Sequence, residues 1–166
     1  MSNTILVTYA SRTGSTAEVA EAIGKTLAEA GLKVDVYPMS DVKTLEPYRA
    51  VVAGSAIQQS QWLPEAMQFI KTQQAALSQK PVALFTVCLT MSMKNETYHQ
   101  GVAKWIAPVR ALVSPISEGY FAGILDISKV PSLRHKIMFR ISVLLGAFST
   151  GAVSYTHLTL PTNREV

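Results

Sequence analysis

The chain has little of what secreted, metal-binding or membrane-spanning proteins need. Its 166 residues include one cysteine, Cys88, so no internal disulfide can form. No apolar run reaches the length needed to cross a membrane, and the N-terminus lacks a signal-peptide pattern. His99 and His135 show no metal-ligand spacing with the cysteine or with each other. These absences favour a cytoplasmic protein without a metal centre.

Charged residues are also scarce, and the positive ones are unevenly placed. They make up 16% of the chain, against 48% hydrophobic residues, as in a globular domain with a core. The net charge is +4, and residues 101–166 carry seven Lys/Arg against three Asp/Glu. Lys129, Arg134, Lys136 and Arg140 cluster with no acid among them. The cluster predicts attraction to an anionic lipid surface or substrate, or else an ordinary solvated helix face. We expect no nucleic-acid partner.

Strand-like and helix-like segments alternate along the chain. Mostly apolar runs predict strands at 5–9, 50–55, 81–87 and 118–125. The alternation of residues 33–37 predicts a further strand that is exposed on one side or lies at a sheet edge. Apolar residues at helical spacing predict helices at 16–30, 64–77, 97–112 with a break at Pro108, and 131–148. A weak helix or loop is expected at 41–48. This alternation predicts an α/β fold with three layers and a doubly wound parallel sheet of five strands, in the order 2-1-3-4-5.

The segment after the first predicted strand has the composition of a phosphate-binding loop. Its residues are Ser11, Arg12, Thr13, Gly14, Ser15 and Thr16. Amides at a helix N-terminus attract anions, the hydroxyls add donors, and the glycine permits a tight turn. The lysine of a nucleoside-triphosphate loop and the three glycines of a dinucleotide loop are missing. The loop therefore suits one terminal phosphate, unless its hydroxyls only cap the helix.

The pattern Ser-x-Thr-Gly-x-Thr resembles the phosphate loop of flavodoxins, which holds the phosphate of FMN. Sheet geometry would bring two further segments to this loop, and both could form a slot for a flavin ring. After the third strand they are Ser55, Ala56, Ile57, Gln58 and Trp62, and around the end of the fourth strand Val87, Cys88, Leu89 and Thr90. Trp62 could stack on the ring or belong to the core. Cys88 is expected to contribute its backbone, because no basic residue adjoins its thiol.

The resemblance extends over residues 4 to about 150. With the phosphate loop, the segments 51–57 and 119–123 resemble the flavodoxin-like family that includes the menaquinone-dependent protoporphyrinogen dehydrogenases. This resemblance implies bound FMN, a porphyrinogen as substrate and a quinone as electron acceptor, with the chemistry carried by the flavin and no catalytic side chain. Two features depart from ordinary flavodoxins, which usually carry asparagine where Ser15 stands and are strongly acidic.

Three functions therefore stay open. The first is an FMN oxidoreductase at the inner face of the cell membrane. The predicted helix 131–148 could lie in a bilayer interface there, or pack on the sheet instead. The second is a flavodoxin-type electron carrier, which the basic charge disfavours because an acidic carrier docks on basic partners. The third is a flavin-dependent quinone reductase fed by a nicotinamide cofactor.

The end of the chain does not resemble the rest. Residues 153–162 resemble translated adapter sequence from sequencing libraries, so we assign the flavodoxin-like domain to residues 1–152 and an artefactual tail to 153–166. The last helix, which is expected to follow Gly151 and to cover one sheet face, is missing. We expect restoration of a natural C-terminal helix to raise the melting temperature, because apolar sheet would otherwise be exposed.

Overall fold

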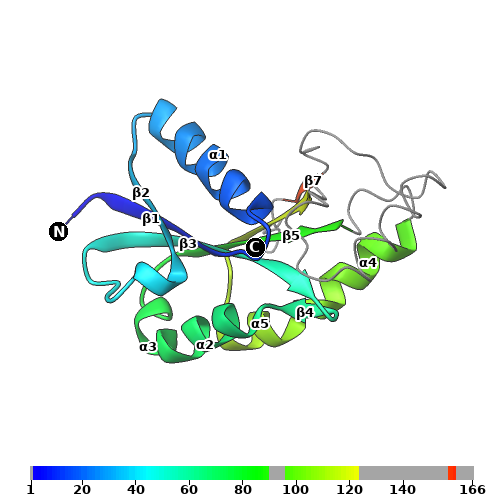
Figure 1. Cartoon of the computed structure of the whole chain (residues 1–166). Coiled ribbons are helices and arrows are strands. Elements are labelled where there is room, and N and C mark those ends of the chain that lie inside the picture. Colours follow the sequence, from blue (N-terminus) through cyan, green and yellow to red (C-terminus); the bar gives the residue numbers. More distant parts are fainter. Residues whose placement is uncertain (1, 90–95, 124–156, 160–166) are drawn as a thin grey trace, which may run out of the picture.

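The computed structural model describes residues 2–89, 96–123 and 157–159, and a parallel sheet forms its middle layer (Figure 1). The five parallel strands lie in the order β2-β1-β3-β5-β6. They are β1 (Thr4–Ala10), β2 (Lys33–Pro38), β3 (Tyr48–Gln58), β5 (Val82–Cys88) and β6 (Ser117–Ala122). The predicted α/β class and the strand order 2-1-3-4-5 are confirmed.

Two short antiparallel strands extend the sheet beyond the five that were predicted. β4 (Gln61–Trp62) folds back on β3, pairing Ile57 with Trp62 and Gln58 with Gln61. β7 (His157–Thr159) pairs with β6 at the far edge of the sheet. Both were missed because two or three residues are too few to give a periodic pattern. β7 lies in the segment 153–166, which the sequence predicts to be an artefactual tail.

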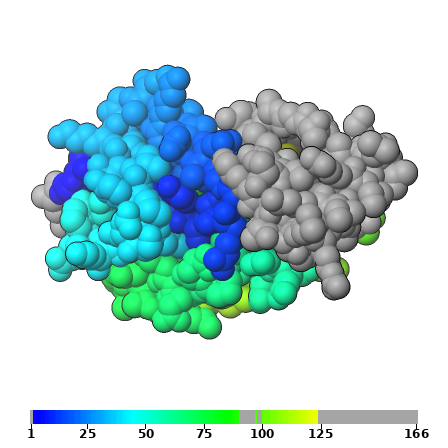
Figure 2. Space-filling view, in the orientation of Figure 1, coloured from blue at the N-terminus to red at the C-terminus, as the bar shows by residue number. Residues whose placement is uncertain are grey.

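Helices cover the two faces of the sheet. α1 (Ser15–Glu29) lies on one face, and α2 (Pro64–Thr72), α3 (Gln74–Leu77) and α5 (Ala107–Leu112) lie on the other (Figure 1). α4 (Glu96–Trp105) precedes α5, and a short 3-10 turn, η1 (Met39–Asp41), follows β2. In the space-filling view, α1 forms the blue upper part of the surface and the green helices the lower part (Figure 2). No described helix is long and apolar enough to cross a bilayer.

Two predicted helices differ in detail from the structure. The segment 64–77 is two helices that meet at Gln73. The segment 97–112 breaks at Ile106, and Pro108 lies in the first turn of α5, where its missing N–H costs nothing. At 41–48, where a weak helix or a loop was expected, the chain is a loop after the end of η1 at Asp41, and Leu45 is buried there. The predicted helix 131–148 and the basic cluster at 129–140 lie outside the described residues.

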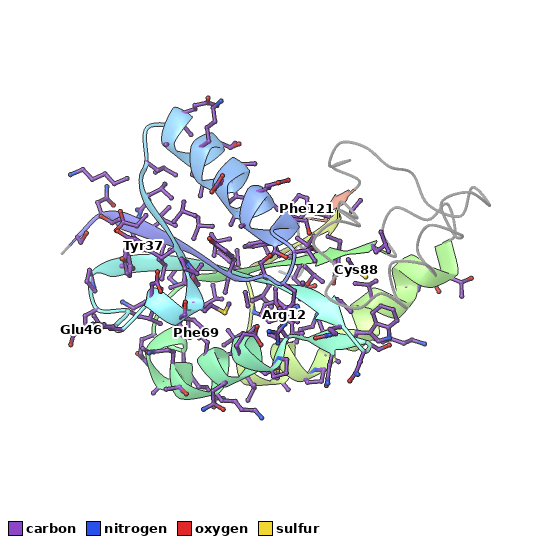
Figure 3. The ribbon with its side chains drawn as sticks, viewed as in Figure 1. Arg12, Tyr37, Glu46, Phe69, Cys88 and Phe121 are labelled. Atoms are coloured by element: carbon purple, nitrogen blue, oxygen red, sulfur yellow. The ribbon has the colours of Figure 1, made fainter. Side chains whose placement is uncertain are left out.

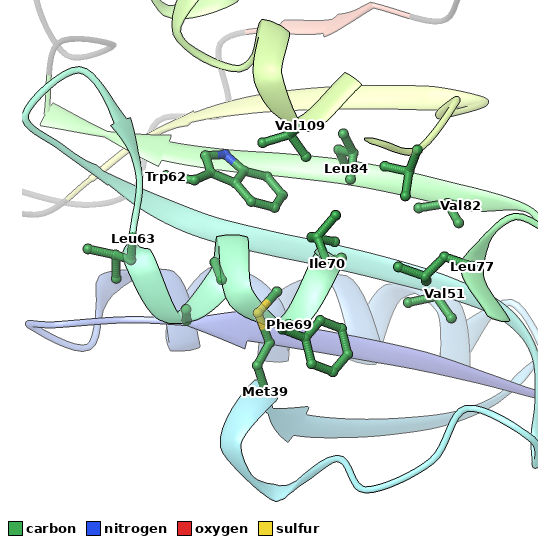
Figure 4. Packing of buried hydrophobic residues seen from close by; sticks show 14 of the residues in the cluster. Met39, Val51, Trp62, Leu63, Phe69, Ile70, Leu77, Val82, Leu84 and Val109 are labelled. Carbon is green, nitrogen blue, oxygen red and sulfur yellow. The ribbon is translucent and has the colours of Figure 1, made fainter. Parts of the chain in front are cut away.

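Neighbouring strand residues point to opposite faces of the sheet, and each face is covered by a hydrophobic cluster. Leu6 and Leu84 belong to a cluster under α2, α3 and α5, which Figure 4 shows from close by. Val7 and Phe85, one residue further along, belong to a second cluster under α1. This arrangement explains why β1 and β5 are nearly continuous apolar runs rather than alternating ones.

An apolar groove of about 340 Å³ lies beside α1, over β3, β5 and β6. Its lining includes Ile23 and Leu27 of α1, and Phe85 and Phe121 of the sheet. Of the described helices, α1 is the one on this face (Figure 1). The groove is apolar sheet surface that α1, among the described helices, leaves uncovered.

Candidate functional site

The loop between β1 and α1 is closed by a hydrogen bond of its own. Ser11 Oγ accepts the N–H of Gly14 at 3.0 Å. Gly14 is the residue before α1 and has φ 96°, a left-handed conformation that a side chain would oppose. No side chain caps the helix, so the N–H groups of Ser15, Thr16 and Ala17 have no acceptor within it. These amides and the helix dipole make the N-terminal end of α1 a binding seat for an anion.

Thr16 adds a hydroxyl that lacks a partner. Its side chain is fully buried, and among the described residues no hydrogen bond reaches Thr16 Oγ1. A buried hydroxyl without a partner costs about 1–3 kcal/mol. A phosphate oxygen held by the neighbouring amides would accept from it. The residues present therefore fit a phosphate monoester, as the sequence indicated.

The ends of β5 and β6 lie next to this seat. A Cβ added to Gly123 would lie 3.4 Å from Val87 Cγ1, 3.6 Å from Ser15 Oγ and 3.7 Å from the Leu89 nitrogen. The N–H of Gly123 donates to the Cys88 carbonyl at 3.2 Å. Ser15 of the phosphate loop and Leu89 after β5 thus both lie beside Gly123. Gly123 is not among the residues that the sequence assigned to the site, and a Cβ there would make only ordinary van der Waals contacts.

The predicted loop after the third strand is a β-hairpin instead. β3 continues through Ser55, Ala56, Ile57 and Gln58, and the chain turns at Gln59 and Ser60, whose φ angles are 52° and 60°. Both turn residues are left-handed, as a two-residue hairpin requires. The sequence hid this turn because Gln-Ser lacks the asparagine or glycine that usually marks it.

Ser55 holds the hairpin in place rather than facing a ligand. Its buried hydroxyl donates to the Ala56 carbonyl at 2.8 Å and accepts the N–H of Leu63 at 3.1 Å. Ala56 and Ile57 are partly exposed, and Gln58 is exposed. A ligand at this edge would therefore contact Ala56 to Gln58 and not the Ser55 hydroxyl.

Trp62 belongs to the core, and its predicted stacking on a flavin is wrong in this structure. The indole is 1% exposed, packs in the cluster of Figure 4, and donates from Nε1 to Thr86 Oγ1 at 3.0 Å. The second interpretation of this residue, a core tryptophan, is the one that holds. Trp62 lies two residues before Pro64, the first residue of α2.

The predicted residues at the end of β5 are largely inward-facing. Val87 is 3% exposed and lies in the core under α1. Cys88 is 7% exposed and packs with Val102 and Ala122 on the opposite side. Leu89 is partly exposed, and Thr90 lies outside the described residues. The side chains of Val87 and Cys88 thus form a wall, and ligand contact here falls to the backbone.

Arg12 extends from the phosphate loop to the first turn of α2. Its Nη2 lies 3.1 Å from Glu65 Oε2, and the two side chains are 56% and 43% exposed. Figure 3 labels Arg12 at the start of the loop. Beside this ion pair is a cavity of about 410 Å³ between β1, η1 and α2, lined by Ser11, Met39 and Phe69 among others. Of the loop hydroxyls, Thr13 and Ser15 are partly exposed.

A polar cluster away from this loop joins α5 to β6. Arg110 donates to both carboxylate oxygens of Glu118 at 2.5 Å and to the Tyr120 hydroxyl at 2.7 Å. Hydrogen bonding to the guanidinium lowers the pKa of Glu118, and burial raises the pKa of Tyr120. Sequence reasoning did not find this cluster, because its members come from separate elements.

Comparison with known proteins agrees with this geometry. A family model described as a flavodoxin domain matches residues 6–150. No curated protein matches the chain. Among solved structures, an archaeal flavodoxin is 21% identical with a TM-score of 0.53, covering 87% of this chain and 98% of its own. The apo form of an NADH:FMN oxidoreductase is 14% identical with a TM-score of 0.56, covering 96% and 97%.

A third similar structure is part of a larger protein. The rubredoxin oxygen:oxidoreductase of Desulfovibrio gigas is 13% identical with a TM-score of 0.54, and the match covers 89% of this chain but only 35% of that one. At such identities the three structures establish the fold. The family match spans most of the chain, so the chain belongs to the flavodoxin-domain family. FMN is the cofactor of this family, in agreement with the sequence prediction.

Proposed function

We propose that the chain is an FMN-dependent oxidoreductase that oxidises a porphyrinogen and passes the electrons to a quinone. The observation that carries the flavin part is the seat at the end of α1, where uncapped amides surround the unpartnered hydroxyl of Thr16. The porphyrinogen and the quinone rest on the sequence resemblance and on the basic charge of the last third of the chain.

Bound FMN supplies the redox chemistry, accepting electrons from a reduced substrate and passing them on. The protein's residues bind and orient it. The amides of Ser15 to Ala17 and the Thr16 hydroxyl hold the phosphate. The backbone at Leu89, which lies beside Gly123, and the sheet edge at Ala56 to Gln58 would offer backbone groups to a flavin ring whose phosphate occupies the seat. The buried side chains of Val87 and Cys88 would exclude water from the sheet side of the bound flavin.

The basic residues at 129–140 support an anionic substrate or surface. Porphyrinogens carry carboxylates, and quinones dissolve in membranes, so one cationic segment with an apolar stripe could serve both. Flotation with anionic liposomes tests the membrane part. Binding that is lost at high salt supports it, and failure to float at any salt concentration removes it from the proposal.

A flavodoxin-type electron carrier is the second candidate. The match to the archaeal flavodoxin covers 98% of that chain, and carriers need no site besides the flavin. A third candidate, a quinone reductase fed by a nicotinamide cofactor, is favoured by the likeness to the NADH:FMN oxidoreductase over almost its full length.

One series of measurements separates these candidates. The purified chain is reconstituted with FMN, and its visible spectrum is followed during anaerobic mixing with protoporphyrinogen, with NADH, or with a flavodoxin reductase and its reductant. Bleaching by protoporphyrinogen and reoxidation by menadione support the proposal. Bleaching by the reductase alone indicates a carrier, and bleaching by NADH alone indicates a quinone reductase. A chain that binds no FMN contradicts all three.

A further inference from the structure

The ion pair between Arg12 and Glu65 links the two helical layers across the carboxyl end of β1. Arg12 is the one charged residue in the segment 11–16. Its guanidinium reaches not the end of α1 but the first turn of α2, on the opposite face of the sheet, where Glu65 Oε2 lies 3.1 Å away. The cation of the phosphate loop is thus bound to a carboxylate, and among the described residues no ion pair is formed at the seat beside it.

A phosphate monoester would compete for this cation. It carries about −1.5 to −2 charges at neutral pH, and a guanidinium pairs with it more strongly than with a carboxylate that is exposed to water. Both side chains of the ion pair are about half exposed, so the pair is weak and the arginine is free to exchange partners.

We propose that Glu65 is a positioning residue that holds Arg12 off the phosphate seat and thereby limits the affinity for FMN. The inference rests on the proposed flavin site and concerns the phosphate alone. When the phosphate binds, Arg12 leaves Glu65 for it, and the cost of breaking the ion pair reduces the net affinity. Removing the Glu65 charge therefore strengthens FMN binding.

Plain repulsion between Glu65 and the phosphate would act in the same direction without Arg12. A double-mutant cycle separates the two. If Glu65 acts through Arg12, Glu65→Gln has no effect once Arg12 is alanine. If it acts by repulsion, the effect of Glu65→Gln is the same in the Arg12→Ala background.

The test is titration of the full chain and its variants with FMN and with riboflavin, which lacks the phosphate, followed by flavin fluorescence at low salt. We expect Glu65→Gln to tighten FMN binding about two- to fivefold, the range of a surface charge pair, and to leave riboflavin binding unchanged. The gain should shrink at high salt and vanish in the Arg12→Ala background. Glu46→Gln, an exposed carboxylate far from Arg12 in Figure 3, is the matched control and should change neither affinity.

Three results would overturn the inference while FMN still binds. They are an unchanged FMN affinity in Glu65→Gln, an equal gain for riboflavin, and a gain that persists undiminished without Arg12. Loss of FMN binding in every variant, with normal thermal melts, would instead contradict the proposed function and the inference with it. Arg12→Lys should keep part of the Glu65 effect, because it keeps the charge but loses the planar donor pair.

Discussion

At the scale of single residues, the buried hydroxyl of Thr16 gives the sharpest test of the flavin site. Thr16→Val removes a donor that would bind phosphate, so FMN affinity should fall about tenfold, equivalent to roughly 1.4 kcal/mol, while riboflavin affinity holds. Stability of the flavin-free protein should be equal or higher, because the hydroxyl has no partner there.

Thr8→Val is the matched control for this variant. Thr8 is also fully buried with an unpartnered hydroxyl, but it lies within β1 and not at the end of α1. Flavin fluorescence titration should show no change for Thr8→Val. Equal losses of FMN affinity in both variants would mean that Thr16 has no direct contact with the phosphate.

At Gly54, a single added carbon atom would disrupt the packing of the core. An added Cβ there would overlap the ring of Phe85 on the neighbouring strand, since Gly54 and Phe85 are paired in register. We expect Gly54→Ala to lower the free energy of unfolding by about 3 kcal/mol, measured by urea denaturation. Gly101→Ala, in α4 with its nearest neighbouring atom at 3.7 Å, should instead gain about 0.5–1 kcal/mol. A loss in Gly54→Ala no larger than in an ordinary surface variant would contradict this account.

The position of Trp62 could not be predicted from its local sequence. Its type and its place after a strand were compatible with a ligand-stacking role and with the core. The choice depended on a turn at Gln59 and Ser60 that carries no glycine or asparagine, and on a hydrogen bond to Thr86 from another strand. Neither is visible in the local sequence.

At the scale of elements, the cluster of Arg110, Glu118 and Tyr120 fixes α5 against β6. Because Arg110 lowers the pKa of Glu118 in the folded chain, the ionised pair stabilises the fold above the ordinary carboxyl pKa of about 4.3. This contribution is lost as the pH falls below that value towards the lower folded pKa. Glu118→Gln should cost about 1 kcal/mol at pH 7, discounted because Arg110 is partly exposed, and the difference should fade below about pH 4.

Urea unfolding of the wild type and Glu118→Gln between pH 3 and pH 7 checks this prediction. The control is Glu29→Gln, whose pair with Lys25 is 3.9 Å long and largely exposed, and which should follow the wild type at every pH. A pH-independent difference for Glu118→Gln would mean that lost packing, rather than charge, is responsible.

The predicted elements held where burial dictates the pattern and failed where the chain turns. The strands at 5–9 and 81–87 are buried on both faces, so each is a continuous apolar run that the sequence shows directly. Helix ends at Gln73 and Ile106 depend on how consecutive helices fit one another against the sheet. Pro108 correctly indicated a break in the helix. Because proline is tolerated in the first turn of a helix, the break falls before it, at Ile106.

At the scale of the whole molecule, the boundary at residue 152 stays a prediction. The segment beyond it includes β7, which adds three residue pairs to the edge of β6. We expect a chain ending at residue 152 to unfold cooperatively, to bind FMN, and to lose no more than about 1–2 kcal/mol of stability, the worth of a few edge hydrogen bonds. Calorimetry and FMN titration of both lengths check this, and loss of cooperative unfolding would show that the tail belongs to the fold.

The site as a whole was partly predictable, because two of its features are general. A strand, a hydroxyl-rich loop and a helix start make an anion seat in any sequence, and parallel strands bring their carboxyl ends to one edge. Ser15 and Leu89 accordingly both lie beside Gly123 at the carboxyl end of the sheet. The partner of Arg12 was not predictable, since Glu65 is more than fifty residues away and reaches the loop only through the placement of α2.

The contact between Gly54 and Phe85 also bears on how such chains diverge. The aromatic ring occupies the space that a side chain at position 54 would need, so neither position can change alone without a clash or a void. In an alignment of homologues, residue volumes at 54 and 85 should vary inversely, with an aromatic at 85 only where 54 is glycine. Such paired variation would report the spacing between β3 and β5 independently of any flavin requirement.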